Sequence, residues 1–361
     1  MNKLVVTYIP NTSQYIDRCN QIIDAIPKGF KGRILTKKAS DSLEHSENLD
    51  VMEFSKSIFT RSVFLNIYLF FYIKRLKCSE IIVLDWFRNF TLLCLLKFIL
   101  RKKIRIIYAP LISDFGWLYK RVNKLAPSCG LRYDWLRIKG SLIDYIYCKS
   151  VDGVVVQSER LADFYCRIYK ISKDNVFVNY NHFEFTLVQK PHSNISNSKK
   201  ISIGFVGNIE RHKGLSDMIK ICSALPQEFQ LILAGKTKGY ENKKLFRSLM
   251  ATGKCIWMGQ IQRDKILKLY EEIDCLLLLS FHEGSPRVIR EFLEYNKAIF
   301  LYNNPGLDYM SGLQACYFYD YGDWKRCLNA IKTHNFNDTI KRKVPKRLTY
   351  NNLKLILKEM Q

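Results

Sequence analysis

The sequence has no apolar run that approaches the roughly 20 residues needed to cross a bilayer. Its two longest apolar stretches, residues 63–73 and 91–100, are interrupted by Asn66 and Lys97, so both are expected to be core helices. No secretory leader is recognisable, and the 11 cysteines form neither a C-x-x-C pair nor a zinc-like spacing. Such cysteine usage is typical of free structural thiols in a reducing compartment, so we expect a cytoplasmic protein.

Acidic residues are scarce. The chain has 33 Asp and Glu against 57 Lys and Arg, which gives a net charge of +24 spread over both halves. Such a field attracts polyanions, which include phosphorylated substrates, anionic lipid surfaces and nucleic acids. Charge alone does not choose among them, and a generally basic soluble protein has the same composition.

A length of 361 residues with 48% hydrophobic content favours two packed domains. In both halves apolar strands alternate with helical segments, which predicts an α/β fold with parallel sheets. The polar segment 189–200 is the best linker, because it has little to bury and contains Pro, Ser and Asn. We predict an amino-terminal domain over residues 1–190, a carboxy-terminal domain over 198–340 and a final helix over 341–361.

The predicted elements follow from apolar runs and their turn residues. The expected strands are 4–9, 81–84, 104–108, 153–157, 176–178, 201–206, 229–234, 255–258, 276–279 and 298–302. The expected helices are 14–26, 56–77, 90–100, 135–149, 158–169, 215–225, 263–273, 324–333 and 348–360.

The chain is organised around residues 276–296, which read as a buried strand, a polar loop and a helix. Ser285 is the predicted N-cap and Pro286 the first helical residue. Glu283 lies in the loop, and Glu291 lies off the apolar stripe of the helix. The stripe comprises Val288, Ile289, Phe292 and Leu293. Ligands of open α/β sheets bind at such a turn, and a helix start there favours a phosphate. From residue type alone, both glutamates could equally be solvated surface carboxylates.

Glu283 and Glu291, in the context EGSPRVIRE after an apolar strand, resemble the E-x7-E signature of retaining glycosyltransferases of family 4. Residues 207–214, GNIERHKG, are similar to the donor-phosphate loop G-R-x4-K-G of that family, with Asn208 in place of the arginine. The resemblance implies the GT-B fold, in which two Rossmann-like, doubly wound domains face each other across a cleft.

The resemblance also implies roles for these residues. Lys213 would pair with the diphosphate of a UDP- or GDP-linked sugar and stabilise it as it leaves. Glu283 would orient the donor sugar as the second catalytic residue, and Glu291 would bind the ribose. The implied donor-binding set is Gly207, Asn208, Arg211, Gly214, Gly259, Gln260, Gly284, Ser285, Arg287, Val288 and Glu291. No metal or other cofactor is expected, since the chain has no D-x-D. A solvated loop lysine is the alternative for Lys213.

Ser113 and Asp114 follow a predicted strand and are candidates for acceptor contacts. Basic and aromatic residues gather in the first half, which suits an anionic membrane surface, although core helices with basic ends would look the same. The cluster comprises Phe71, Tyr72, Lys74, Arg75, Lys77, Arg101, Lys102, Lys103, Trp117, Tyr119, Lys120, Arg121 and Lys124.

We therefore expect a hexosyltransferase that moves a sugar from a nucleotide sugar to a glycan or lipid-linked acceptor. By the resemblance it would act in bacterial surface polysaccharide synthesis (O-antigen, capsule or lipopolysaccharide), peripheral on the cytoplasmic face of the inner membrane. A nucleotide-sugar epimerase or phosphorylase on the same fold is the enzymatic alternative. Nucleic-acid binding is the other alternative, but no recognised motif supports it.

Overall fold

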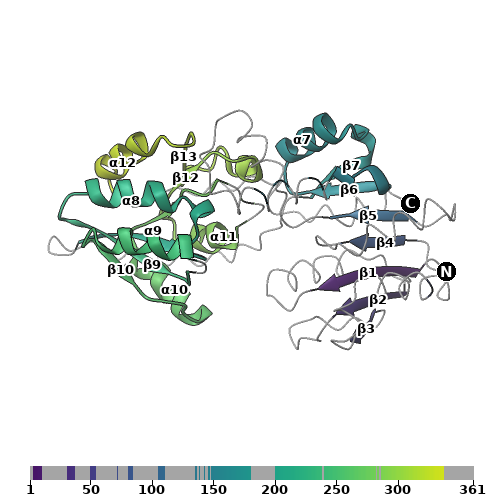
Figure 1. Cartoon of the computed structure of the whole chain (residues 1–361), viewed down its shortest axis with the longest axis horizontal. Coiled ribbons are helices and arrows are strands. Elements are labelled where there is room, and N and C mark those ends of the chain that lie inside the picture. Colours follow the sequence, from purple (N-terminus) through teal and green to yellow (C-terminus); the bar gives the residue numbers. More distant parts are fainter. Residues whose placement is uncertain are drawn as a thin grey trace. The chain divides into compact units, whose positions relative to one another are not determined.

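A computed structural model of the chain describes residues 3–9, 31–36, 49–53, 80–83, 105–109, 151–179, 200–237, 240–281, 283 and 286–336, together with Phe71 and several helical residues between 135 and 150. These residues contain two parallel sheets, each of which belongs to its own compact unit (Figure 1). The parallel α/β architecture predicted from the sequence is therefore confirmed. The predicted domain boundaries remain a prediction.

The described part of the first unit has a seven-stranded sheet whose neighbouring strands pair in parallel. Its order is β3 (Leu49–Glu53), β2 (Lys31–Thr36), β1 (Lys3–Ile9), β4 (Glu80–Val83), β5 (Arg105–Tyr108), β6 (Gly153–Val156) and β7 (Val176–Val178). Strands β2 and β3 were not predicted, because KGRILT and LDVME interleave charged residues with short apolar pairs.

Helix α7 (Glu159–Tyr169) begins and ends where its local sequence requires. The Ser158 hydroxyl caps it by accepting a hydrogen bond from the Leu161 N–H at 3.1 Å. Lys170 ends it in the left-handed conformation, with φ of 53°. A short 3-10 helix, η1 (Lys173–Asn175), then leads into β7.

The second unit has a six-stranded parallel sheet within the described residues. Its order is β10 (Cys255–Trp257), β9 (Phe229–Ala234), β8 (Ile201–Val206), β11 (Cys275–Leu278), β12 (Ala298–Tyr302) and β13 (Cys316–Tyr319). All were predicted except β13. The side chains of Cys275–Leu278 are all buried, as expected of a central parallel strand that is covered on both faces.

Helices cover this second sheet. They are α8 (Leu215–Ala224), α9 (Tyr240–Met250), α10 (Arg263–Glu272), α11 (Arg287–Leu293) and α12 (Trp324–Thr333), with the 3-10 helices η2 (Arg211–Lys213) and η3 (Pro305–Met310). Helices α12, α8 and α9 lie side by side in that order (Figure 1). Helix α10 packs against α11 through the rings of Tyr270 and Phe292, whose centroids are 5.5 Å apart.

The start of α11 differs from the prediction. Pro286 occupies the N-cap, and Arg287 is the first helical residue. The ψ of Pro286 is 123°, which is extended, so this proline cannot be the first residue of the helix. Of the predicted apolar stripe, Ile289, Phe292 and Leu293 are buried, whereas Val288 is only half-buried.

Several predicted elements lie outside the described residues. These are the helices at 14–26, 90–100 and 348–360, most of the helix at 56–77, of which Phe71 is helical, and the linker at 189–200 except Lys200. In the part that the structure describes, no helix is both long and apolar enough to span a membrane.

Gly214 allows α8 to start directly against the end of β11. Its φ is +81°, and a Cβ at this position would lie 2.2 Å from the carbonyl oxygen of Leu279. A side chain there would therefore collide with backbone that cannot move aside without shifting the sheet. Gly253 has a similar φ of +71°, but no atom lies within 4 Å of the position of its Cβ.

Alanine at these two glycines should separate backbone strain from steric collision. Gly253→Ala is expected to lower the free energy of unfolding by about 1 kcal/mol, the cost of a left-handed alanine. Gly214→Ala should lower it by about 3 kcal/mol, because the collision adds to the same strain. Urea denaturation followed by circular dichroism measures both. Equal losses for the two variants would contradict the contact with Leu279.

Candidate functional site

The strand order of the second sheet brings two predicted motifs together. Strands β8 and β11 are neighbours, with Ile203 paired to Cys275 and Gly204 to Leu276. The chain continues from β8 to β9 on one side and from β11 to β12 on the other. The carboxyl ends of β8 and β11 therefore form the topological switch point, where open α/β sheets bind ligands. Residues 207–214 follow β8, and Glu283 lies in the loop after β11.

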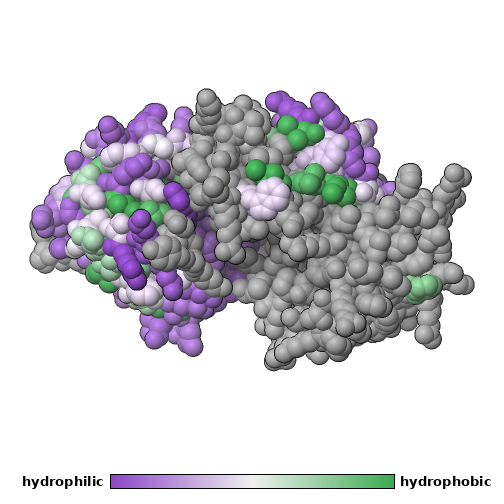
Figure 2. Space-filling view, viewed as in Figure 1, coloured by the Kyte–Doolittle hydropathy of each residue, from purple (hydrophilic) through white to green (hydrophobic). Residues whose placement is uncertain are grey.

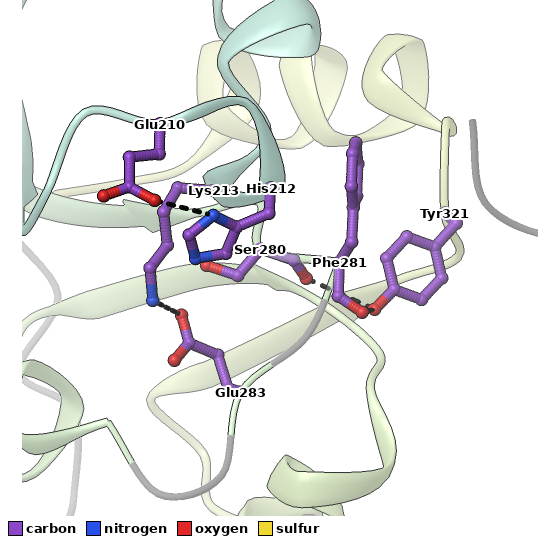
Figure 3. Close-up of polar contacts among 7 residues, drawn as sticks. All are labelled: Glu210, His212, Lys213, Ser280, Phe281, Glu283 and Tyr321. Atoms are coloured by element: carbon purple, nitrogen blue, oxygen red, sulfur yellow. Dashed lines mark hydrogen bonds and ion pairs between the residues drawn. The ribbon is translucent and has the colours of Figure 1, made fainter. Parts of the chain in front are cut away.

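Lys213 and Glu283, the two predicted catalytic residues, contact each other at this point. The Nζ of Lys213 lies 2.5 Å from the Oε1 of Glu283 (Figure 3). The side chain of Glu283 is only 8% exposed and that of Lys213 only 20%. A solvated surface glutamate and a solvated loop lysine are therefore both wrong descriptions of these residues. The pair is a partly buried, charge-assisted hydrogen bond between segments 70 residues apart.

Backbone hydrogen bonds hold the two loops in this arrangement. The N–H of Phe281 donates to the carbonyl of His212 at 2.8 Å. On its other side, the Tyr321 hydroxyl donates to the carbonyl of Phe281 and lies 3.3 Å from that of Ser280 (Figure 3). His212 in turn lies with its Nδ1 3.2 Å from a carboxylate oxygen of Glu210. The segment before Glu283 is thus fixed on both sides.

Glu291 lies in a second polar cluster on α10 and α11. The Tyr270 hydroxyl donates to its Oε2 at 3.0 Å. Its Oε1 lies 3.7 Å from the Nη2 of Arg287 and 3.8 Å from that of Arg263. Burial and, after it, the negative charge of Glu291 raise the pKa of Tyr270 well above its usual value, so the phenol stays protonated. With a side chain 22% exposed, Glu291 is ordered but accessible.

Glycines bring the ends of the strands close together. The N–H of Gly207 donates to the Ala234 carbonyl at 2.9 Å, and the N–H of Gly235 donates to the Gly259 carbonyl at 2.7 Å. A Cβ at Gly235 would lie 1.8 Å from the carbonyl oxygen of Gly207. The structure therefore gathers the predicted residues Gly207 and Gly259 at one edge of the sheet, where backbone can approach a ligand closely.

The structure describes some of the remaining predicted site residues and not others. Asn208 and Gln260 are exposed, whereas Arg211, Arg287 and Val288 are half-buried. Gly284, Ser285 and the acceptor-side candidates Ser113 and Asp114 lie outside the described residues. In the described ranges no three His, Cys, Asp or Glu side chains are grouped so that they could hold a metal ion. A metal-free reaction remains a prediction.

Sequence reasoning missed three residues of the site. Tyr321 lies in the turn after β13, 38 positions beyond Glu283, and no pattern links the two. Tyr270 looked like an ordinary core residue of α10. Ser280 is buried, and its hydroxyl has no hydrogen-bond partner in the part of the chain that the structure describes. A weak signal did exist for Ser280, because a polar residue follows four leucines at a strand end.

Residues 189–349 match the protein family described as "Glycosyl transferases group 1". This part of the chain is therefore similar to group 1 glycosyltransferase domains. It contains β8 to β13 and all the described residues of the predicted donor site. No curated protein sequence matches the chain.

Solved structures extend the likeness over the whole chain. Sucrose-phosphate synthase from Thermosynechococcus elongatus superimposes with a TM-score of 0.73 at 14% identity, covering 100% of this chain and 98% of that one. HepE from Anabaena, in complex with UDP and glucose, gives 0.68 at 14%, covering 100% and 99%. The lipopolysaccharide outer core galactosyltransferase WaaB gives 0.65 at 15%, covering 100% and 98%. At such identities the likeness shows the fold, and the predicted GT-B fold is confirmed.

The group 1 domain and the GT-B fold together establish the enzyme class that the sequence predicted: the chain is a glycosyltransferase. Its donor, acceptor and stereochemistry are finer questions. They depend on the residues at the switch point of the group 1 domain.

A double-mutant cycle on stability tests the contact at the switch point. Lys213→Met should lower the free energy of unfolding by about 1–2 kcal/mol, because it leaves the buried Glu283 carboxylate without its cation. In a Glu283→Gln background the same change should cost about 1 kcal/mol less, since no charge is then left unpaired. Urea denaturation of the four proteins measures the difference. Additive losses would show that the two side chains do not interact.

Proposed function

We propose that this chain is a retaining glycosyltransferase of family 4 that moves a sugar from a UDP- or GDP-linked donor to a glycan or lipid-linked acceptor. The observation that carries the proposal is the contact of Lys213 with Glu283 at the switch point of a group 1 glycosyltransferase domain. A UDP-linked donor is supported by HepE, whose structures are described as complexes with UDP, with UDP and glucose, and with UDP-glucose.

Donor binding rearranges the ion pair. The ammonium of Lys213 leaves Glu283 for the diphosphate, and the freed carboxylate accepts hydrogen bonds from hydroxyls of the donor sugar. Glu291, held by Tyr270, accepts from the ribose. Arg287 and the N–H groups of Arg287 and Val288 lie beside the diphosphate and add positive potential.

The chemical step needs no protein nucleophile. The bond between the anomeric carbon and the diphosphate oxygen breaks, and both bonding electrons stay on that oxygen. Lys213 stabilises this charge, which is the work that a divalent ion does in metal-dependent transferases. The acceptor hydroxyl forms the new bond on the same face of the sugar, and its proton passes to the departing diphosphate oxygen. The configuration at the anomeric carbon is therefore retained.

Two further parts of the proposal concern the acceptor. We propose that Ser113 and Asp114 contact the acceptor, since they follow β5 closely in the sequence. A role in bacterial surface polysaccharide synthesis is supported by WaaB, a lipopolysaccharide outer core galactosyltransferase, and by WaaG, which is described as involved in lipopolysaccharide biosynthesis.

Association with the cytoplasmic face of an anionic membrane is supported by an exposed apolar face in the first unit. The helix between residues 135 and 150 exposes apolar and aromatic side chains at helical spacing, with Lys149 over the ring of Tyr145. The exposed side chains are Trp135, Ile138, Leu142, Tyr145 and Ile146. Figure 2 shows hydrophobic side chains on this surface near α7. Of the basic and aromatic cluster predicted from the sequence, only Phe71 is described, and it is exposed.

Opposite effects of two variants on nucleotide binding test the proposed exchange. Glu283→Gln should bind UDP about fivefold more tightly, because Lys213 is then free for the diphosphate. Lys213→Ala should bind UDP about tenfold more weakly. Both should lose most sugar transfer. Lys325→Ala, an exposed lysine of α12, is the control and should change neither.

A thermal-shift screen with UDP, GDP, UDP-glucose and GDP-mannose selects the nucleotide, calorimetry gives the affinities, and analysis of the products completes the test. Sugar released or rearranged without an acceptor would favour a phosphorylase or an epimerase. Weaker UDP binding by Glu283→Gln would refute the exchange.

The membrane association is tested by flotation with anionic liposomes at low salt. The wild type should float with vesicles that contain phosphatidylglycerol, and its binding should fall as salt screens the charges. The double variant Trp135→Ser/Leu142→Ser should lose most of the bound fraction, because it removes two exposed apolar side chains. Ile256→Ser changes an exposed apolar residue of β10 and should float like the wild type. If the wild type stays in the bottom fraction and does not rise with the vesicles, the proposed membrane association is refuted.

A further inference from the structure

Glu283 needs a second support once a donor is bound. Its carboxylate is held by Lys213. The proposed function requires Lys213 to turn to the diphosphate, which removes that contact just when Glu283 must bind the sugar. Glu283 lies outside any helix or strand, so its position depends on the chain that leads into it.

That chain is held by Tyr321. The Tyr321 hydroxyl donates to the carbonyl of Phe281 and lies 3.3 Å from the carbonyl of Ser280. The opposite side of Phe281 is held by its N–H, which donates to His212 at 2.8 Å. Figure 3 shows Tyr321 on one side of this segment and Lys213, in contact with Glu283, on the other. The Tyr321 hydrogen bonds do not involve Lys213, so they persist after the ion pair opens.

Tyr321 is itself anchored in the framework of the domain. Its ring lies against those of Phe281 and Tyr302, with centroids 5.8 and 5.5 Å away. The Tyr302 hydroxyl donates to the buried carboxylate of Asp217 at 2.7 Å. Asp217 lies in the first turn of α8, the helix that follows the Lys213 loop. The anchor of Tyr321 therefore ends on the same helix that positions the lysine.

We propose that Tyr321 is a positioning residue for Glu283: its hydroxyl holds the backbone carbonyls of Phe281 and Ser280 and so aims the carboxylate at the donor sugar after Lys213 has moved to the diphosphate. This inference rests on the proposed function. It assigns Tyr321 to recognition of the sugar and not of the nucleotide, since its hydroxyl holds the segment that leads to Glu283, whereas the proposed function assigns the ribose to Glu291.

The test compares UDP with UDP-glucose, and GDP with GDP-mannose as a second pair. For each protein, calorimetry gives two dissociation constants, one for the nucleotide and one for the nucleotide sugar. The quantity compared is the ratio of the first constant to the second. Tyr321→Phe should lower this ratio about fivefold, the loss expected for one hydrogen bond, while the affinity for UDP itself changes less than about twofold. In a Glu283→Gln background Tyr321→Phe should leave the ratio unchanged, because its effect passes through Glu283.

Tyr319→Phe is the matched control. It removes a hydroxyl two residues away that makes no hydrogen bond within the described part of the chain, so the ratio should stay at the wild-type value. Melting temperatures of all variants check that the fold is kept. If Tyr321→Phe behaves like Tyr319→Phe, or weakens UDP and UDP-glucose equally, the positioning role is overturned while the proposed function stands. If the wild type binds neither pair, the proposed function fails and the inference fails with it.

Discussion

The site depends on one close approach of backbone to backbone, that of Gly214 to Leu279. A side chain at Gly214 would overlap the Leu279 carbonyl, so only glycine allows the Lys213 loop to lie against the end of β11. The hydrogen bond from the Phe281 N–H to the His212 carbonyl joins the same two loops again, two residues away from Gly214 and Leu279. Because of this contact, Lys213 and Glu283, which are 70 positions apart in the sequence, share a hydrogen bond at the switch point of the sheet.

Three layers of support surround the carboxylate of Glu283. The ion pair with Lys213 is the innermost, the backbone held by Tyr321 is the second, and the contact of Tyr302 with Asp217 is the third. Under the proposed function only the ion pair changes when a donor binds, because the contacts of Tyr321 and Tyr302 do not involve Lys213. Glu283 then keeps its position while its partner is exchanged.

The sequence predicted the parts of the fold whose signal is local. Strand β11 was predicted from four consecutive leucines, and α7 from its apolar face after Ser158. In both cases the signal comes from residues that are adjacent in the sequence. The sequence also placed the 207–214 loop after β8 and Glu283 in the loop after β11, because each motif lies directly after a strand; their role in donor binding remains a prediction. Strands β2 and β3 were missed, since charged residues interrupt their short apolar runs. Strand β13 was also missed, although its four residues, CYFY, are apolar or aromatic.

Contacts between distant segments could not be read from the sequence in the same way. The pairing of Lys213 with Glu283 follows from the order of β8 and β11 in the sheet, which no single motif encodes. Tyr321 and Tyr270 act through hydroxyls whose partners are set by packing. Pro286 was predicted to be the first helical residue, but its extended ψ of 123° makes it the N-cap. Sequence reasoning therefore named the chemical groups, whereas the structure determined their partners.

The ion pair between Lys213 and Glu283 also has a consequence for selectivity. Because the two charges cancel, the switch point offers little attraction to inorganic phosphate or other small anions: an anion that bound Lys213 would leave the buried Glu283 carboxylate without its cation. A ligand that carries both a diphosphate and sugar hydroxyls satisfies the two side chains at once. In a protein with a net charge of +24, the proposed function gives this self-neutralisation a role: it disfavours the binding of small anions at the switch point, where the donor would bind.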